Sequence, residues 1–399
     1  MSSGWNKFKL IDAIQFNPKE IIKKGDVVKK VAMEKLEPFN RKISGYEEVA
    51  FTSGTKFRNG DTLLARITPC LENGKTAQVD ILDKDEVGFG STEYIVLREK
   101  LGVTDNDFIY YLSISPEFRN VAIKAMNGSS GRQRVQKDVL ENSEFTLPPL
   151  YEQKAIAKVL SDLDEKIETN NKINKTLEEM AQAVFKEWFV DFEFPNEECK
   201  PYKSSGGEMV ESEMGMIPKG WEQSTLEEVS RMSAGGDKPK SFSKNATKEK
   251  AVPIYSNGTD NEGLYGYTDK AKIFEESITV SARGTIGYVC LRQQPYFPIV
   301  RLVSVIPREN IITSKYLYFY LKLLNISGTG TTQQQLTVPD FKRTKIWIPE
   351  YKVTKQFTEV TKDIFKKIEN GKSENMKLVQ IRDTLLPKLM SGEIRVPLE

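Results

Sequence analysis

Two stretches of the chain place apolar residues at alternating intervals of four and three. The first runs from Ile156 to Trp188, and the second runs from Phe357 to Leu389. This spacing puts the apolar side chains on one side of a long helix, where a second helix can cover them, so it predicts a coiled coil. The alternative is that each helix packs only on its own globular neighbour. A single amphipathic helix does not normally keep a 3.5-residue spacing for five heptads, so we favour the coiled coil.

Each predicted seam is apolar toward its ends and polar in its middle. The first seam consists of Ile156, Leu160, Leu163, Ile167, Asn170, Asn174, Leu177, Ala181, Val184 and Trp188. The second consists of Phe357, Thr361, Ile364, Ile368, Gly371, Asn375, Leu378, Arg382, Leu385 and Leu389. In an antiparallel pair the two polar middles face each other, which places Asn170 and Asn174 near Gly371 and Asn375. Buried asparagines in a seam fix register and orientation at some cost in stability.

The segments leading into the two helices are copies of each other. "FTLPPLYEQKAIAKVLSDLDEKIE" begins at residue 145 and aligns without a gap with "IWIPEYKVTKQFTEVTKDIFKKIE", which begins at residue 346. The same offset of 201 residues places "GSSGRQRV" over "TGTTQQQL", and a looser match places "DFIYYLSI" over "KYLYFYLKL". Each half also begins with Gly-Trp. Two copies of this length indicate duplicated domains rather than a solenoid.

The globular parts have the alternation of strand-like runs and turns that is typical of a mixed α/β (α+β) fold. The expected strands are Thr62–Arg66, Glu93–Leu97, Ile278–Ser281 and Leu302–Ile306, the expected short helices are Asp107–Ser115 and Lys315–Leu324, and Ser256–Gly266 is expected to be an exposed loop. We predict a first head at 1–150, a long helix at 151–192, a linker at 193–214, a second head at 215–350 and a C-terminal long helix at 351–392. The two similar heads are expected to be separated by the antiparallel coiled coil, with pseudo-two-fold symmetry.

Composition narrows the possible functions. The chain has 399 residues and no histidine, which excludes histidine-based nucleophile activation and histidine-ligated metals and favours a binding protein. Three scattered cysteines form no spaced metal site, and neither a signal peptide nor a long apolar run is evident, so we expect a cytoplasmic protein and no membrane partner. Residues 151–214 hold 15 acidic and 8 basic residues, whereas the second half is basic, so the net charge of +2 does not exclude a polyanion partner.

The whole chain resembles the specificity subunits of type I restriction–modification systems. The resemblance is carried by the tandem plan, by the segment with "LPPLYEQKAIAKVL" and "LDEKIE" that leads into the first long helix, by "IPKGW" at the start of the second head and by the closing "LLPKLMSGEIRV". It implies that each head is a target recognition domain that reads one half of an asymmetric, bipartite site in double-stranded DNA. It also implies that the coiled coil, called the rod below, sets the length of the DNA spacer between the two half-sites.

The resemblance further implies a non-catalytic chain that works through partners. Two methyltransferase (modification) subunits would dock on the rod, and restriction (translocase) subunits would join that core. S-adenosylmethionine, ATP and Mg²⁺ would be used by those subunits, and this chain would hold no cofactor, no catalytic residue and no metal. Two alternatives are a coiled-coil scaffold for proteins that never touches DNA and an autonomous methyltransferase. The second is disfavoured because "LPPLY" lacks the polar first residue and the aromatic fourth residue of the amino-methyltransferase motif.

The candidate DNA-binding residues lie in loops and at strand ends of the two heads, and several of them occupy similar places in both. Arginine suits the edge of guanine and glutamine suits the edge of adenine, whereas hydroxyls and lysines suit phosphates. In the first head the candidates are Arg66, Asn73, Lys75, Ser129, Ser130, Arg132, Gln133 and Arg134. In the second they are Lys238, Lys240, Arg283, Thr331, Thr332, Gln333 and Gln334, with Gln335 adjoining. The competing interpretation is that these side chains bond to local backbone, form structural ion pairs or face solvent. Because "GSSGRQRV" and "TGTTQQQL" differ in chemistry, the two half-sites should differ.

Overall fold

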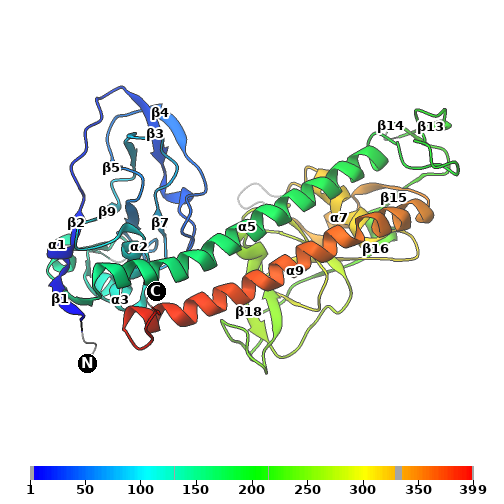
Figure 1. Cartoon of the computed structure of the whole chain (residues 1–399). Helices are drawn as coiled ribbons and strands as arrows, with labels where there is room; N and C mark the ends of the chain where they lie inside the picture. The colour runs from blue at the N-terminus through cyan, green and yellow to red at the C-terminus, as the bar shows by residue number, and fades with distance from the viewer. Residues whose placement is uncertain (1–3, 130, 214, 329–334, 398–399) are drawn as a thin grey trace. The chain divides into compact units, whose positions relative to one another are not determined.

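The computed structural model describes residues 4–129, 131–213, 215–328 and 335–397. The chain forms two compact units. Unit 1 consists of Met1–Lys172 with Gly371–Glu399, and unit 2 consists of Ile173–Asn370. The boundaries fall inside both long helices, α5 (Leu150–Phe189) and α9 (Tyr351–Met390). Each unit therefore contains one head and a part of each long helix (Figure 1).

Within unit 1 the two helices run antiparallel. Asn170 of α5 donates a hydrogen bond to Asn375 of α9 at 2.9 Å, and six residues earlier on α5 Asp164 meets Arg382, seven residues later on α9. Asn170 also donates to Glu374 at 2.8 Å, and Asn375 donates to Asn171 at 2.8 Å. The predicted meeting of Asn170 and Asn375 is thus present in the polar middle of the pair.

Within unit 2 the helices meet through aromatic side chains. The rings of Phe185 and Trp188 on α5 lie 5.8 and 6.0 Å from the ring of Phe357 on α9. All of the predicted seam residues on both helices are buried or half-buried, including Ile156, Leu160, Leu163, Ile167, Asn174, Leu177, Ile364, Ile368, Leu378 and Leu385. The regular 4-3 spacing therefore marks the covered side of each helix.

The head of unit 1 contains two four-stranded sheets. One has the strand order β2-β9-β6-β7 and the other β4-β3-β8-β5, with β3 parallel to β8. Their strands are β2 (Ile14–Phe16), β9 (Tyr94–Glu99), β6 (Thr62–Ala65), β7 (Thr76–Gln78), β4 (Glu47–Ala50), β3 (Val27–Val31), β8 (Gly88–Gly90) and β5 (Thr55–Phe57). The run "TLLA" of β6 is buried throughout, as expected for a short apolar run in a core strand.

Short helices and two-stranded ladders complete unit 1. The ladders pair β1 (Asn6–Lys9) with β12 (Glu144–Leu147) and β10 (Met126–Asn127) with β11 (Arg134–Val135). The helices are α1 (Leu10–Ala13), α2 (Asn106–Ile114), α3 (Pro116–Lys124), α4 (Lys137–Glu141) and a 3₁₀ turn η1 (Met33–Lys35). The side chain of Asp105 accepts the backbone N–H of Phe108 at 3.1 Å and so caps α2, whose aromatic side chains are buried in the core.

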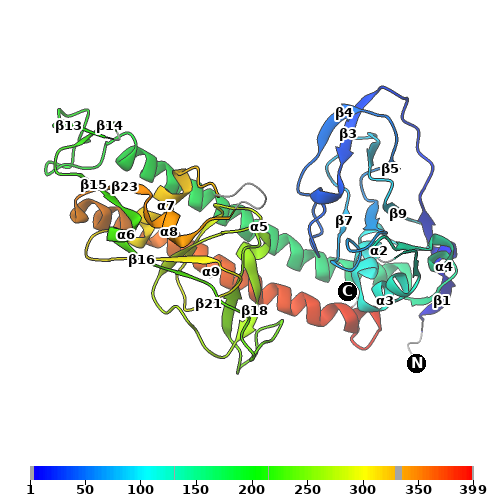
Figure 2. The same ribbon diagram turned by 180° about the vertical axis from the view of Figure 1, so that it is seen from behind.

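The head of unit 2 repeats the first sheet of unit 1. Its four-stranded sheet has the order β16-β22-β19-β20, and the ladder β15-β23 corresponds to β1-β12. The strands β15 and β23 are labelled beside each other in Figure 2. The strands are β13 (Met209–Ser212), β14 (Gly215–Pro218), β15 (Glu222–Thr225), β16 (Ser230–Ala234), β17 (Val252–Tyr255), β18 (Leu264–Thr268), β19 (Ser277–Val280), β20 (Val289–Arg292), β21 (Phe297–Pro298), β22 (Val303–Pro307) and β23 (Lys345–Ile348). The helices are α6 (Leu226–Val229), α7 (Ser314–Leu323), α8 (Val338–Lys342) and a 3₁₀ turn η2 (Asp260–Gly263).

The predicted class, a mixed α and β fold with two similar heads and two long antiparallel helices, is confirmed. The expected strands coincide with β6, β9, β19 and β22, and the expected short helices coincide with α2 and α7. In the part of the chain that the structure describes, no helix is both long and apolar enough to cross a membrane.

Two segments differ from their predicted character. The segment 193–214 was predicted as a linker, but Phe194 near its start is buried against the ring of Trp221 at 5.6 Å, as is Phe192 just before it at 5.4 Å. The expected loop Ser256–Gly266 contains η2 and the beginning of β18. Both segments are rich in glycine and polar residues, and that composition hid the apolar anchors and the paired backbone.

Candidate nucleic-acid interface

In unit 1 the candidate residues gather where the loop 128–133 returns to the sheet. The backbone N–H of Val135 donates to the carbonyl oxygen of Arg66 at 2.9 Å, and the N–H of Thr68 donates to the carbonyl of Gln133 at 3.0 Å. The Arg66 guanidinium then donates through Nη2 to the carbonyl of Val135, also at 2.9 Å. These bonds hold the end of β6 and the loop in one place.

Arg134 is oriented by a glutamate at this junction. Its Nε donates to both carboxylate oxygens of Glu93, at 3.0 and 2.9 Å, and its Nη2 donates to one of them at 2.7 Å. Hydrogen bonding from Arg134 lowers the pKa of the Glu93 carboxyl, and the charges of Arg134 and Arg66 act in the same direction. The guanidinium has five N–H donors in a fixed plane, so this pair leaves others for a nucleic acid.

The other candidates in unit 1 are placed less uniformly. Asn73 and Arg132 are exposed, Gln133 is half-buried and Ser129 is exposed. Lys75 is half-buried, and its Nζ donates to the carbonyl of Met33 at 3.0 Å, which is a structural contact. Ser130 lies outside the described residues. Arg66, Gln133 and Arg134 are thus brought together at one junction, whereas Lys75 ties the neighbouring turn to the chain.

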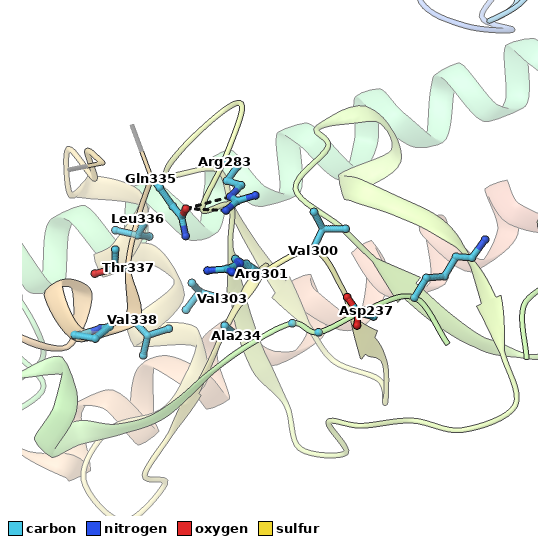
Figure 3. Close-up of a pocket in the computed structure, with 14 residues that line it drawn as sticks. Ala234, Asp237, Arg283, Val300, Arg301, Val303, Gln335, Leu336, Thr337 and Val338 are labelled. Atoms are coloured by element: carbon cyan, nitrogen blue, oxygen red, sulfur yellow. Dashed lines mark hydrogen bonds between the residues drawn. The ribbon is translucent and has the colours of Figure 1, made fainter. Parts of the chain in front are cut away.

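In unit 2 the corresponding place is a pocket of about 700 Å³. Arg283 and Gln335 point toward each other there, and Arg301 lies on the same wall (Figure 3). The Oε1 atom of Gln335 accepts from Nε and Nη2 of Arg283 at 3.2 and 2.9 Å. Lys238 and one carboxylate, Asp237, also line the pocket, so its charged side chains are predominantly basic.

Lys238 and Lys240 lie on the exposed surface of unit 2. The ammonium of Lys238 is 4.2 Å from the ring centre of Phe242 and 5.8 Å from that of Tyr265, which holds the charge over two aromatic faces. Lys238 borders the pocket, whereas Lys240 is not among the residues that line it. Thr331, Thr332, Gln333 and Gln334 lie outside the described residues.

Arg301 was missed from the sequence. It follows Val300, and both residues have left-handed backbones, with φ of 62° and 52°. A β-branched residue in this conformation is strained, and such strain is concentrated at functional sites. The backbone N–H groups of Val300 and Arg301 donate to the carbonyls of Gly236 and Gly235 at 2.8 and 2.9 Å, which holds the turn. No local sequence pattern signals this geometry, because it depends on pairing with a distant glycine pair.

Both sites have the same plan with different chemistry. Arg66 and Arg283 each follow the end of a central strand, and each donates to the segment that returns after the loop, Arg66 to the carbonyl of Val135 and Arg283 to the side chain of Gln335. The offset of 201 residues places Gln335 at the position of Arg134. The two units therefore offer similar basic frames with an arginine fork in one and a carboxamide in the other.

Both halves of the chain match a known protein family. The family model described as "Type I restriction modification DNA specificity domain" matches residues 2–179 and 218–378, which is most of the chain and both halves of the repeat. The chain belongs to the type I restriction–modification DNA specificity family.

Relatives in this family match the chain along most of its length. The HindI specificity subunit of Haemophilus influenzae is 27% identical over 421 residues, covering 88% of this chain and 90% of that protein. The MjaIX specificity subunit of Methanocaldococcus jannaschii is 31% identical over 313 residues, covering 73% of this chain and 69% of that protein. The resemblance inferred from the sequence is confirmed: the chain is a DNA specificity subunit of the type I family.

A solved structure supports the fold. The S subunit of a type I restriction–modification system from M. genitalium aligns over 97% of this chain and 96% of its own, with a TM-score of 0.52 and 17% identity. Membership of the family makes DNA an expected partner of the chain. It also disfavours the alternative of a scaffold that never touches DNA.

Proposed function

We propose that each head of this specificity subunit reads one half of an asymmetric, bipartite site in duplex DNA. Unit 1 would do so with Arg66, Gln133 and Arg134, and unit 2 with Arg283, Arg301 and Gln335. The chain carries no catalysis of its own in this proposal. Its task is to place partner subunits on the sequence that it recognises.

The observation that carries the proposal is the difference between Arg134 and Gln335. These residues occupy matched positions, and each is held by side-chain hydrogen bonds, Arg134 by Glu93 and Gln335 by Arg283. An arginine fork suits the O6 and N7 acceptors of guanine. The Oε1 atom of Gln335 is occupied by Arg283, so its Nε2 amide would donate to a base acceptor such as N7 of adenine. Holding each side chain in advance reduces the entropy lost on binding. Different groups in equivalent frames support two unlike half-sites.

Phosphate contacts would come from the flanking residues. Ser129 and Arg132 are exposed beside the junction of unit 1, and Lys238 borders the pocket of unit 2. Such contacts position a protein on DNA and steepen its dependence on salt without reading sequence. Asn73 and Lys240 are exposed candidates for the same role, and Lys75 is a weaker one because its ammonium already serves the fold.

The coiled coil would set the spacer between the half-sites, and partners would supply the chemistry. Modification subunits, two in number, would dock on the helices and the adjoining surfaces, and restriction subunits would join them. S-adenosylmethionine, ATP and Mg²⁺ would then be bound by those partners. The absence of histidine from the chain supports a division of labour in which this subunit recognises and the others react.

Methylation mapping tests the proposal directly. Genomic DNA from cells carrying the complete complex is sequenced for modified bases, with and without the gene for this chain. We expect one bipartite motif, with unlike halves and a fixed spacer, to lose its methylation when the chain is removed. Unchanged methylation, or a motif with identical halves, would contradict the proposal.

A further inference from the structure

The long helices, the first four-stranded sheet and the ladder beside it recur in both units, which allows side chains on these elements to be compared position by position. At the end of α5 the N–H of Glu193 donates to the carbonyl of Glu187, and at the end of α9 the N–H of Ile394 donates to that of Lys388, at 2.9 and 3.2 Å. Both residues of the second bond lie 201 positions after their counterparts. The repeat therefore holds through the whole of both helices and past their ends.

Unit 1 contains an ion pair between the two halves of the chain. Nη1 of Arg382 on α9 donates to Oδ1 of Asp164 on α5 at 2.8 Å, and the side chains are only 9% and 11% exposed. The hydroxyl of Tyr111 in α2 donates to the other carboxylate oxygen at 2.7 Å. One charge of the pair belongs to the first half of the repeat and the other belongs to the second.

Unit 2 replaces all three polar groups with apolar ones. The offset of 201 residues places Phe365 at the position of Asp164 and Ala181 at the position of Arg382. The match of "DFIYYLSI" with "KYLYFYLKL" places Phe319 at the position of Tyr111. The rings of Phe319 and Phe365 lie 6.0 Å apart, and all three residues are buried in one hydrophobic cluster. A polar triad in one unit is therefore an apolar triad in the other.

A second ion pair in unit 1 also joins the two halves of the repeat. Nη1 of Arg395, after α9, donates to Glu152 of α5 at 2.6 Å, and the Glu152 side chain is 7% exposed. The indole N–H of Trp5 donates to the same carboxylate at 3.0 Å, and the Arg395 guanidinium lies 5.4 Å from the Trp5 ring. This pair again joins an acid from the first half of the repeat to a base from the second.

In unit 2 apolar residues occupy the positions of this second ion pair. The offset places Val353 at the position of Glu152 and Phe194 at the position of Arg395. Trp221, which like Trp5 precedes the first strand of its ladder, has the ring of Phe194 stacked on it at 5.6 Å and an interplanar angle of 26°. Among the described residues, the buried indole nitrogen of Trp221 has no hydrogen-bond partner, which matches the loss of the acid.

A third set has the charges in unit 2. Glu178 of α5 accepts from the hydroxyl of Tyr318 and from Nζ of Lys322, the latter at 2.5 Å. In unit 1 the corresponding positions hold Val379, Tyr110 and Ile114. Within the described part of the chain the buried hydroxyl of Tyr110 has no hydrogen-bond partner. Here too an acid on α5, in the first half of the repeat, bonds to side chains of the second half.

These exchanges penalise the pairing of either half with its own copy. Two first halves would bury Asp164 opposite Ala181, with no cation beside the carboxylate. Two second halves would bury the Arg382 guanidinium opposite Phe365, leaving beside it only the exposed carboxylate of Asp383, to which its Nε and Nη2 donate at 3.0 and 2.9 Å. Breaking a buried ion pair by removing one partner is strongly destabilising, whereas an apolar replacement of both partners is tolerated. The costs therefore fall on like-with-like pairs alone.

We propose that these ion pairs, above all the buried pair of Asp164 with Arg382, make the two halves of the chain recognise each other and reject a second copy of themselves. The partner that fits the apolar and acidic face of α5 is thus the second half of the repeat, with arginines at the positions of Arg382 and Arg395. The duplication kept the backbone of a symmetric dimer, and the side chains restrict it to an asymmetric pairing. This inference does not depend on which DNA sequence is read.

The test uses the full chain, folded and then cut. A protease site inserted between Ser205 and Gly206, which are exposed, lets the folded protein be cleaved into two associated fragments. The fragments are separated in urea and returned to buffer, and native mass spectrometry counts the mixed and the like-with-like complexes. We expect the ratio of mixed to like-with-like complexes to be at least tenfold above its statistical value, at which the two kinds are equally abundant. Fragments that reassociate in a statistical 1:2:1 proportion would overturn the proposal.

Two sets of substitutions separate pairing choice from general stability. Converting unit 1 to the residues of unit 2, with Tyr111→Phe, Asp164→Phe and Arg382→Ala, should bring the ratio toward the statistical value. An unchanged tenfold preference in this variant would contradict the role of the triad. The exchange Asp164→Arg with Arg382→Asp keeps an ion pair but places the cation on α5 and the anion on α9. A D164R first fragment should therefore associate with an R382D second fragment at least tenfold better than with the unmodified one, and equal association with both would also contradict the proposal.

Discussion

Arg134 and Glu93 form a two-pronged ion pair beside the loop 128–133, with three nitrogen–oxygen distances between 2.7 and 3.0 Å. The pair ties the residue that we assign to base recognition to the adjoining end of β9. It fixes the plane of the guanidinium before DNA arrives. The carboxylate is therefore a positioning group, and its titration reports whether the arrangement exists in solution.

The titration of Glu93 is the first prediction. Hydrogen bonding from Arg134 lowers the pKa of the Glu93 carboxyl from its ordinary value of 4.5. A carboxyl with a lowered pKa in the folded state adds stability above its unfolded pKa, and this contribution disappears as the pH falls through the folded value. In Arg134→Gln the NMR titration midpoint of Glu93 should rise toward 4.5.

Asp83 provides the matched control for this titration. Its pKa is lowered by a hydrogen bond from Lys29, elsewhere in unit 1, so its midpoint should not move in Arg134→Gln. A Glu93 midpoint that is the same with and without Arg134 would show that the pair does not persist in solution. Equal movement of both carboxyls would instead indicate a general disturbance of the head.

The second prediction concerns the stability of unit 1. Arg382→Ala leaves Asp164 buried without a cation, and such a change costs about 3 kcal/mol of unfolding free energy. Lys158→Ala, which removes an exposed partner of Asp162 on the same helix, should cost much less, because solvent screens an exposed pair. Urea unfolding of the two variants measures the difference. Equal losses would show that the buried pair contributes no more than a surface pair.

The third prediction concerns the rod. Inserting seven residues after Lys172 and seven after Asn370 keeps the heptad phase of both helices and lengthens the pair by about 10 Å, or about three base-pair steps. The methylated motif should then keep both half-site sequences and gain a longer spacer. Altered half-sites with an unchanged spacer would contradict the proposal that the heads recognise the sequence and the coiled coil sets the spacer length.

Much of the architecture could be predicted because it rests on local periodicity. The 4-3 spacing gave the covered face of each helix, and the repeat gave two heads with matched strands. The site was harder, since Arg301 is positioned by left-handed backbone at Val300 and by pairing with Gly235 and Gly236. Composition misled at 193–214, where Phe194 anchors a polar segment to Trp221. The exchange of polar for apolar groups between the units could be recognised only from three-dimensional contacts, which the spacing of residues in the sequence does not reveal.

The most direct measurement of the central claim is the methylation motif obtained with single substitutions in the complete complex. Arg134→Ala should relax one position in one half-site, at a cost of about 1–3 kcal/mol in discrimination, and Gln335→Ala should do the same in the other half. Arg231→Ala is the control, because that exposed arginine also pairs with a glutamate but lies outside both candidate sites. We predict one altered half-site for each of the first two variants and an unchanged motif for the control. A motif that stays the same in both variants, or that changes in both halves at once, would contradict the account.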